Sequence, residues 1–165
     1  MFTISIYTLS YYLIEIRPHD NFINEKIKTY SELSKNHLLL EKMAIKEETQ
    51  NGILRYAAHS LAVDNIKHGF RNYWHLIGLH WHLWIWIRYT DNEIFQLWLA
   101  MVPNGSGRGM NEASMFYFNS KIEDLSCNQL AQLVVMVRSP SMFKPGSDRS
   151  NKRIKNKGII SVCNS

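Results

Sequence analysis

The chain has 165 residues, 45% of them hydrophobic and 20% charged, so it can bury one core and is not a disordered polypeptide. Its two cysteines, Cys127 and Cys163, form no C-x-x-C pair and no evident disulfide framework, which favours a reducing compartment or indifference to redox conditions. The net charge is +5, and six of the 19 basic residues lie in residues 144–157. Two interpretations of that basic segment stay open: a frayed, solvated end, or a surface for an anionic partner such as membrane headgroups or a pyrophosphate.

The first 50 residues divide into an apolar segment and an amphipathic one. Residues 1–14 are apolar but too short to span a bilayer, and they lack the basic start of a signal peptide. Alternation of Phe2, Ile4 and Ile6 suits a short strand, with insertion into a membrane interface as the alternative. Residues 21–48 have apolar side chains at helical spacing, which predicts one or two helices with a break near Ser34. Asn51–Gly52 then predicts a turn.

Two helices are expected next, over residues 53–66 and 73–87. The second is apolar almost all round and contains four of the five tryptophans, which suits a buried helix or one lying in a membrane interface. His68, His75 and His82 are seven residues apart and would share one stripe, but no pair has the one-turn spacing of a zinc helix. We therefore expect these histidines to be polar positions on a mostly apolar helix and not metal ligands.

The last 75 residues have clear helix boundaries. Thr90 followed by Glu93 predicts a capping box, and the helix it starts should end before Pro103. A glycine loop follows, then a helix from Gly109, and then a helix over residues 126–137 that Ser126 caps and Ser139–Pro140 stops. No internal repeat is visible, so the predicted class is mainly α.

The glycine loop is the first candidate for a binding site. Gly105, Gly107 and Gly109 alternate around Arg108, a pattern that could hold an anionic group through backbone N–H groups and a guanidinium. A nucleotide-binding loop would need a strand before it and, for a P-loop, a Gly-Lys-Ser/Thr sequence, and neither is present. Nucleic-acid binding is not expected either, because no recognition motif accompanies the basic segment.

An ordered series of motifs surrounds this loop. RYTDNEIFQLWLAM precedes it, GMNEASMFYF follows it, and then come Asp-Leu-Ser at 124–126, PSMFKP at 140–145 and basic residues to Arg153. In order and spacing, these roughly 65 residues resemble the second half of the glycosyltransferase family 51 domain, the peptidoglycan glycosyltransferase. The resemblance implies a lysozyme-like, mainly α lobe, which residues 1–50 would precede as a helical extension.

Upstream of residue 88 the resemblance weakens. LAVDNIKHGF (61–70) is similar to the family's first motif but is about three residues shorter, and Asp64 stands where that motif has its general-base glutamate. The family's Gly-Gly-Ser-Thr-Ile-Thr-Gln-Gln motif is absent, and the second family glutamate would fall near Gly78. Glu93 and Glu112 are the other carboxylates of the matched region. Helix capping explains Glu93, and a position on a helix surface explains Glu112.

The resemblance also implies a chemistry. In the family, a carboxylate deprotonates an acceptor 4-hydroxyl, which attacks the donor's anomeric carbon, while cations stabilise the departing lipid pyrophosphate. Asp64 would be the base, and the pyrophosphate would meet basic residues and, by family resemblance, Mg²⁺ or Mn²⁺; the candidate cations are Arg108, Arg88, Arg71 and Lys144.

We therefore predict a divergent, shortened peptidoglycan glycosyltransferase-like domain over residues 51–157, followed by a tail over 158–165. Its expected partners are a lipid-linked peptidoglycan precursor, the membrane surface and cell-wall synthases, at the periphery of the bacterial inner membrane. Two alternatives remain: a non-catalytic relative that scaffolds a synthase, and a membrane-surface helical binding protein.

Overall fold

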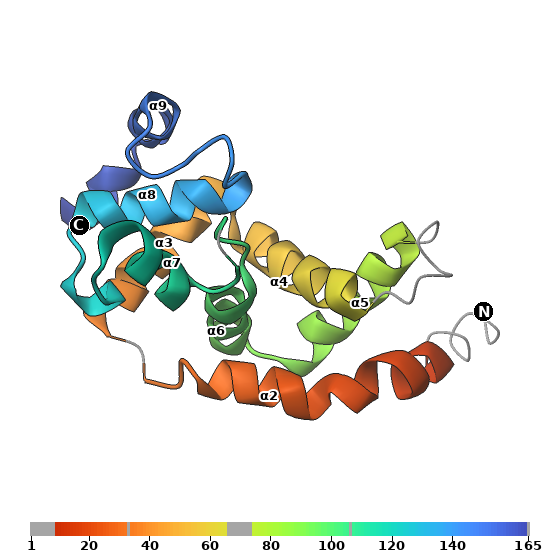
Figure 1. Cartoon of the computed structure of the whole chain (residues 1–165). Coiled ribbons are helices and arrows are strands. Elements are labelled where there is room, and N and C mark those ends of the chain that lie inside the picture. The colour runs from red at the N-terminus through yellow and green to blue at the C-terminus, as the bar shows by residue number, and fades with distance from the viewer. Residues whose placement is uncertain (1–8, 33, 66–73, 106, 165) are drawn as a thin grey trace.

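The computed structural model describes residues 9–32, 34–65, 74–105 and 107–164 (Figure 1). These residues are mainly helical, and their one β-type pairing is an isolated bridge between Pro103 and Arg108. The predicted mainly α class is therefore confirmed. The α-helices are α2 (Asp20–Lys28), α3 (Lys35–Glu48), α4 (Gln50–Asn65), α5 (Trp74–Arg88), α6 (Asp91–Met101), α7 (Met110–Phe118), α8 (Cys127–Arg138) and α9 (Asp148–Lys157). The described residues also form a π-helical turn η1 (Tyr12–Ile16) and the short 3-10 helices η2 (Arg17–His19), η4 (Ile122–Asp124) and η5 (Ile159–Asn164).

The core lies around α6 and α8, whose side chains are buried on nearly every face. Trp98 and Phe95 of α6 are among the largest fully buried side chains, and α8 buries an unbroken run from Leu130 to Val137. Helix α2 packs on α6, α3 on α8, and α4 on both α5 and α6. Helix α9 and the N-terminal segment lie at opposite ends of the molecule (Figure 1).

Three helices start with reciprocal caps. The hydroxyls of Ser34, Thr90 and Ser126 accept from the backbone N–H three residues on, and the side chain at that third position accepts in return. Each pair satisfies two backbone donors that a helix start would otherwise leave exposed. The boundaries predicted at Thr90 and Ser126, and the break near Ser34, are confirmed.

The predicted turn at Asn51–Gly52 is wrong, because both residues lie in the first turn of α4. The chain turns earlier, at Thr49, which adopts φ 72° between α3 and α4. A Cβ on Gly52 would lie 2.8 Å from Cβ of Glu48, so the glycine permits a close approach between the two helices.

The basic C-terminal segment is ordered, so its interpretation as a frayed end is wrong. Ser147 caps α9 at its start, and Gly158 ends it in the left-handed conformation. Ile154 is buried, and Arg153 forms an ion pair with Glu47, whose side chain has no exposed surface. The buried Ile154 side chain and the ion pair between Arg153 and the buried Glu47 carboxylate hold this very polar helix on the core.

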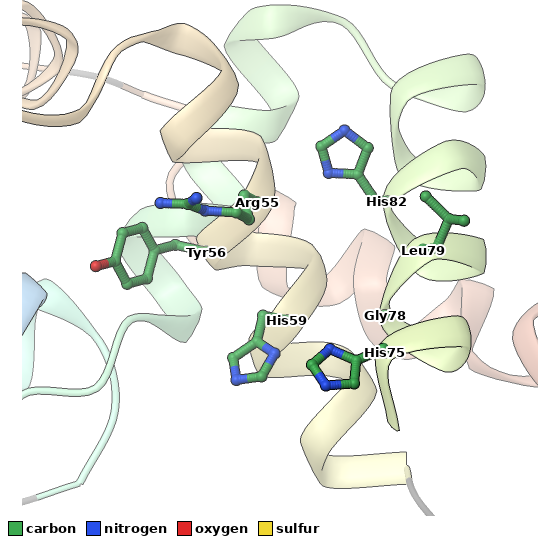
Figure 2. Close-up of a pocket in the computed structure, with 7 residues that line it drawn as sticks. All are labelled: Arg55, Tyr56, His59, His75, Gly78, Leu79 and His82. Atoms are coloured by element: carbon green, nitrogen blue, oxygen red, sulfur yellow. The ribbon is translucent and has the colours of Figure 1, made fainter. Parts of the chain in front are cut away.

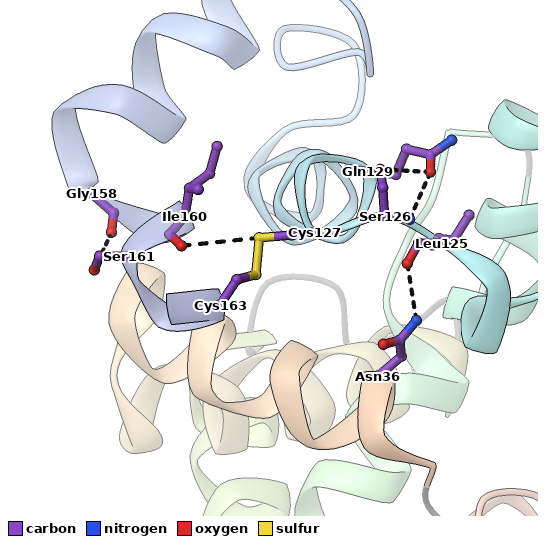
Figure 3. The surroundings of a disulfide bond; sticks show 9 residues. All are labelled: Asn36, Leu125, Ser126, Cys127, Gln129, Gly158, Ile160, Ser161 and Cys163. Atoms are coloured by element: carbon purple, nitrogen blue, oxygen red, sulfur yellow. Dashed lines mark hydrogen bonds between the residues drawn. A yellow bond between two sulfur atoms is a disulfide. The ribbon is translucent and has the colours of Figure 1, made fainter. Parts of the chain in front are cut away.

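The expectation of no disulfide is also wrong. Cys127, the first residue of α8, is bonded to Cys163 of η5, with Cα atoms 6.3 Å apart (Figure 3). Their sequence separation of 36 follows no motif spacing, and only the packing of η5 on α3 and α8 brings the two sulfurs together. A structural disulfide favours an oxidising compartment over the reducing one expected from the sequence.

Two sequence-based expectations fall outside the described residues. The strand or interfacial insertion at Phe2, Ile4 and Ile6 precedes residue 9, and Arg71 and His68 lie in the stretch 66–73. Over the ranges that the structure describes, every helix is too short or too polar to cross a bilayer.

Candidate functional site

The glycine loop between α6 and α7 is closed by its own hydrogen bonds. The Gly109 N–H donates to the Val102 carbonyl at 2.8 Å, and the Asn104 N–H donates to the Gly107 carbonyl at 3.2 Å. The buried Asn104 side chain donates to the Gly109 carbonyl at 2.9 Å. Two N–H groups that an anion would need are therefore already used within the loop.

Backbone conformation and close packing explain why two of the three loop positions are glycine. Gly105 adopts φ +82°, and a Cβ there would lie 2.8 Å from the Tyr117 hydroxyl and 3.2 Å from Cβ of Pro140. Gly109 adopts φ +97°, and its Cβ would lie 3.2 Å from the Ala100 carbonyl. Gly107 borders open space. The alternating glycines thus fold a tight connection more than they form a phosphate cradle.

Arg108 reaches from this loop to the last turns of α4. Its Nη2 lies 2.6 Å from Oδ1 of Asp64, and its Nη1 donates to the Ser60 carbonyl at 3.1 Å. The side chains of Arg108 and Asp64 are 35% and 38% exposed, so the ion pair is partly open to solvent. The carboxylate and the cation that the resemblance assigns to one site are therefore in contact.

The other candidate cations lie elsewhere. Arg88 ends α5, where it pairs with Asp20 at 2.9 Å and lies over the Tyr12 ring, so it holds the N-terminal segment. Burial raises the pKa of Asp20, although the charges of Arg17 and His19 act in the opposite direction. Lys144 lies in the connection from α8 to α9. Arg71 lies outside the described residues.

A groove of about 480 Å³ opens between α4 and α5 (Figure 2). In Figure 2, His59 of α4 and His75 of α5 face each other, and His82 extends from α5 towards α4. Burial and the Arg55 charge both lower the pKa of His82. The full lining is Arg55, Tyr56, His59, His75, Gly78, Leu79 and His82.

The sequence pointed to only half of this groove. The seven-residue spacing of His75 and His82 predicted one stripe on α5, and both side chains do line the groove. Arg55 and His59 were missed, although their i, i+4 spacing puts them on one face of a helix. Gly78, near which the resemblance places a second carboxylate, lines the groove too, and a Cβ there would meet no atom within 4 Å.

The described residues do not fit the divalent metal that the resemblance implies. Mg²⁺ and Mn²⁺ prefer several oxygen ligands, whereas the partner of Asp64 is a guanidinium. Within the described part of the chain, no three His, Cys, Asp or Glu residues are grouped as metal ligands.

Comparison with known proteins places the similarity mainly in the C-terminal half. The model of the Transglycosylase family matches residues 81–162. The chain is 35% identical to penicillin-binding protein 1B of Haemophilus influenzae over 69 residues, 39% of this chain and 9% of that protein. It is 36% identical to penicillin-binding protein 1B of Escherichia coli over 63 residues, 35% of this chain and 8% of that protein.

A third relative covers more of the chain. The uncharacterized protein YfeL of Salmonella typhimurium is 25% identical over 145 residues, 84% of this chain and 76% of that protein. No solved structure matches. The family match begins within α5 and ends within η5, and it includes the caps at Thr90 and Ser126, the glycine loop, and the core helices α6 and α8. Over residues 81–162 the chain therefore resembles the transglycosylase family, and the matches support a divergent domain like that of glycosyltransferase family 51.

Proposed function

We propose that this protein acts on a lipid-linked disaccharide pyrophosphate in bacterial cell-wall synthesis, as a divergent peptidoglycan glycosyltransferase. The contact between Asp64 and Arg108 carries the proposal, because it joins the candidate base to the family-matched loop. These two residues are 44 positions apart, so their contact comes from the fold and not from local sequence.

In the proposed step, Asp64 takes the proton of an acceptor hydroxyl. The hydroxyl oxygen then bonds to the anomeric carbon of the donor, and the bond from that carbon to the pyrophosphate oxygen breaks with its electron pair. Arg108 contacts Oδ1 of Asp64, so Oδ2 can accept the substrate hydroxyl at a carboxylate that solvent already reaches. Arg108, anchored by the Ser60 carbonyl, fixes the direction of the carboxylate.

Two features support a place at the outer surface of the inner membrane. The disulfide between Cys127 and Cys163 suits an oxidising compartment. Helix α5 buries Ile77, Trp81 and Ile85, and it exposes a second set of large apolar side chains: Leu76, Leu79, Trp86 and Ile87. An exposed face rich in Leu and Trp suits contact with a membrane interface. We therefore propose that the protein associates peripherally with the membrane.

The experiment is glycan-strand formation from lipid-linked disaccharide by purified protein. We expect Asp64→Asn to lower the rate by about 10²–10⁴, the usual contribution of a positioned general base. Glu112→Gln is the matched control, since it removes a carboxylate at the start of α7 and should leave the rate within about threefold. Wild-type protein that forms no strands, or an Asp64→Asn variant that equals wild type, would overturn the catalytic proposal.

A non-catalytic relative that binds the same lipid intermediate is the second candidate. Gly78 favours it, because this position would hold the family's second carboxylate and instead leaves an open groove. In that case the wild-type protein binds the lipid-linked disaccharide without forming strands, and Arg108→Ala weakens binding. Strand formation that depends on Asp64 rules this candidate out.

A further inference from the structure

We propose that the groove between α4 and α5 binds an amphiphilic anion, a phosphate or pyrophosphate headgroup joined to a hydrocarbon chain. The inference rests on the proposed function, in which such a lipid pyrophosphate is the leaving group, and it assigns that group to residues that mostly precede the family match. Of the groove-lining residues, only His82 falls inside the matched range, which starts at residue 81.

The polar wall of the groove carries a cation that is not neutralised. Arg55 is 70% exposed and lies 4.0 Å from Glu48, but the same carboxylate is 3.2 Å from Arg138. One carboxylate therefore serves two guanidiniums, and the three groups together keep one positive charge. A phosphate group at the groove would complement that charge and could accept from the Arg55 fork.

Three imidazoles supply the remaining polar contacts. His59 and His75 face each other across the groove, and His82 lies further along α5 (Figure 2). A neutral imidazole donates through one nitrogen, and a protonated one donates through both and adds a charge. An anion between α4 and α5 would therefore face imidazole groups from both helices.

The groove also continues into apolar surface. Leu79 lines the groove and is largely exposed. Leu76, next to His75 in the sequence, and Val63, one helical turn after His59, are exposed as well. A hydrocarbon chain attached to the headgroup could lie on these side chains and remove them from water. An inorganic anion would use only the polar wall, so the arrangement suits an amphiphile better.

The groove shares helix α4 with the candidate catalytic pair. His59 and Asp64 are five residues apart on α4, a rise of about 7.5 Å along the helix axis. Tyr56 lines the groove and lies on the same helix face as Ser60 and Asp64, at i, i+4 and i+8. Arg108 is already held by Asp64 and the Ser60 carbonyl, so a headgroup in the groove would find its own cation at Arg55.

The test measures binding of three probes to the full chain: farnesyl pyrophosphate, inorganic pyrophosphate and farnesol. We expect farnesyl pyrophosphate to bind at least tenfold more tightly than either of the others. Arg55→Gln and the double variant His59→Gln/His75→Gln should each weaken it at least fivefold. Their side chains are exposed, so both variants should fold, and far-ultraviolet circular dichroism verifies this.

His80→Gln is the matched control. It removes an imidazole from the same helix, but this ring contacts Tyr11 and the Leu76 carbonyl rather than the groove. Its affinity should equal that of wild type. Equal affinity of wild type and both groove variants overturns the inference, as does equal binding of farnesyl and inorganic pyrophosphate.

Failure of this inference and failure of the proposed function give different results. If wild type forms no glycan strands but binds farnesyl pyrophosphate through Arg55 and the histidines, the catalytic proposal fails and the groove assignment stands. If strands form and depend on Asp64 while the groove variants keep wild-type kcat/KM and wild-type affinity, the groove assignment fails alone. A concentration-dependent dimer that the groove variants abolish, without probe binding, also overturns the assignment, since a second copy would then occupy the groove.

Discussion

Helices α6 and α8 differ from helices α4 and α5 in how they use apolar side chains. The first pair lies inside the family-matched region and buries almost every such residue, including Trp98. The second pair buries one face and exposes another, on which Trp86 is 63% exposed beside a groove lined with histidine. The family match therefore follows the packed core, while the groove lies on the surface of α4 and α5, mostly ahead of the matched residues.

The largest effect should come from comparing two tryptophans across these regions. Trp98→Ala removes a side chain that is 2% exposed and should lower the free energy of unfolding by about 3–5 kcal/mol. Trp86→Ala removes an exposed side chain and should change it by about 0.5 kcal/mol or less. Urea unfolding of both variants measures the difference, and equal losses would contradict the division into packed core and functional surface.

Arg153→Ala should be the next most damaging change. It leaves the Glu47 carboxylate buried without its guanidinium, which typically costs about 3–5 kcal/mol. We expect a cost near the lower end of this range, because the Arg153 side chain is itself partly exposed. Arg149→Ala, on the same helix, is the control and should cost less than about 0.5 kcal/mol. If the two variants unfold at the same urea concentration, Glu47 does not hold α9 to the core.

The disulfide should contribute somewhat less. Removing Cys127–Cys163 by a double Cys→Ala change should cost about 2–4 kcal/mol, since it frees a loop of 36 residues in the unfolded chain. A reducing agent should lower the free energy of unfolding of wild type by the same amount. It should not change that of the double variant. Protein taken from cells should resist thiol alkylation at both cysteines, and full alkylation would contradict an oxidising compartment.

The smallest effect concerns the buried His37 on α3. Burial lowers its pKa, although the Glu123 charge opposes the shift. The folded state therefore favours neutral His37, and its contribution to stability is present above the unfolded pKa of about 6.5 and is lost as the pH falls below it. His37→Gln keeps an acceptor for the Ser34 N–H and should show a smaller loss between pH 7 and about 5. Identical pH profiles from urea unfolding would count against this assignment.

Local signals predicted most helix starts. Thr90 and Ser126 were recognisable because a capping box depends on residues three apart, and the glycine loop because positive φ selects glycine. The same local logic failed at Asn51–Gly52, where Gly52 serves close packing against Glu48 inside a helix. It also failed for α9, which is too polar to show an apolar stripe and depends on Glu47 in a distant part of the chain.

The site was only partly visible in the sequence, for the same reason. The resemblance singled out Asp64 and Arg108, but their 2.6 Å contact depends on how α4 packs on α6. Half of the groove was not predicted because its histidines come from two helices, and the histidine spacing along α5 gives no sign of His59 on α4. The disulfide was missed because the two cysteines are 36 positions apart and no motif links them.

A double-mutant cycle on glycan-strand formation tests the central claim most directly. Because Arg108 positions Asp64, the account predicts that Arg108→Ala slows the reaction and that Asp64→Asn slows it by about 10²–10⁴. It also predicts that the double variant is no slower than Asp64→Asn alone, as expected for residues that act as one unit. Fully additive losses in the double variant, or a wild-type protein that forms no strands, would contradict the claim.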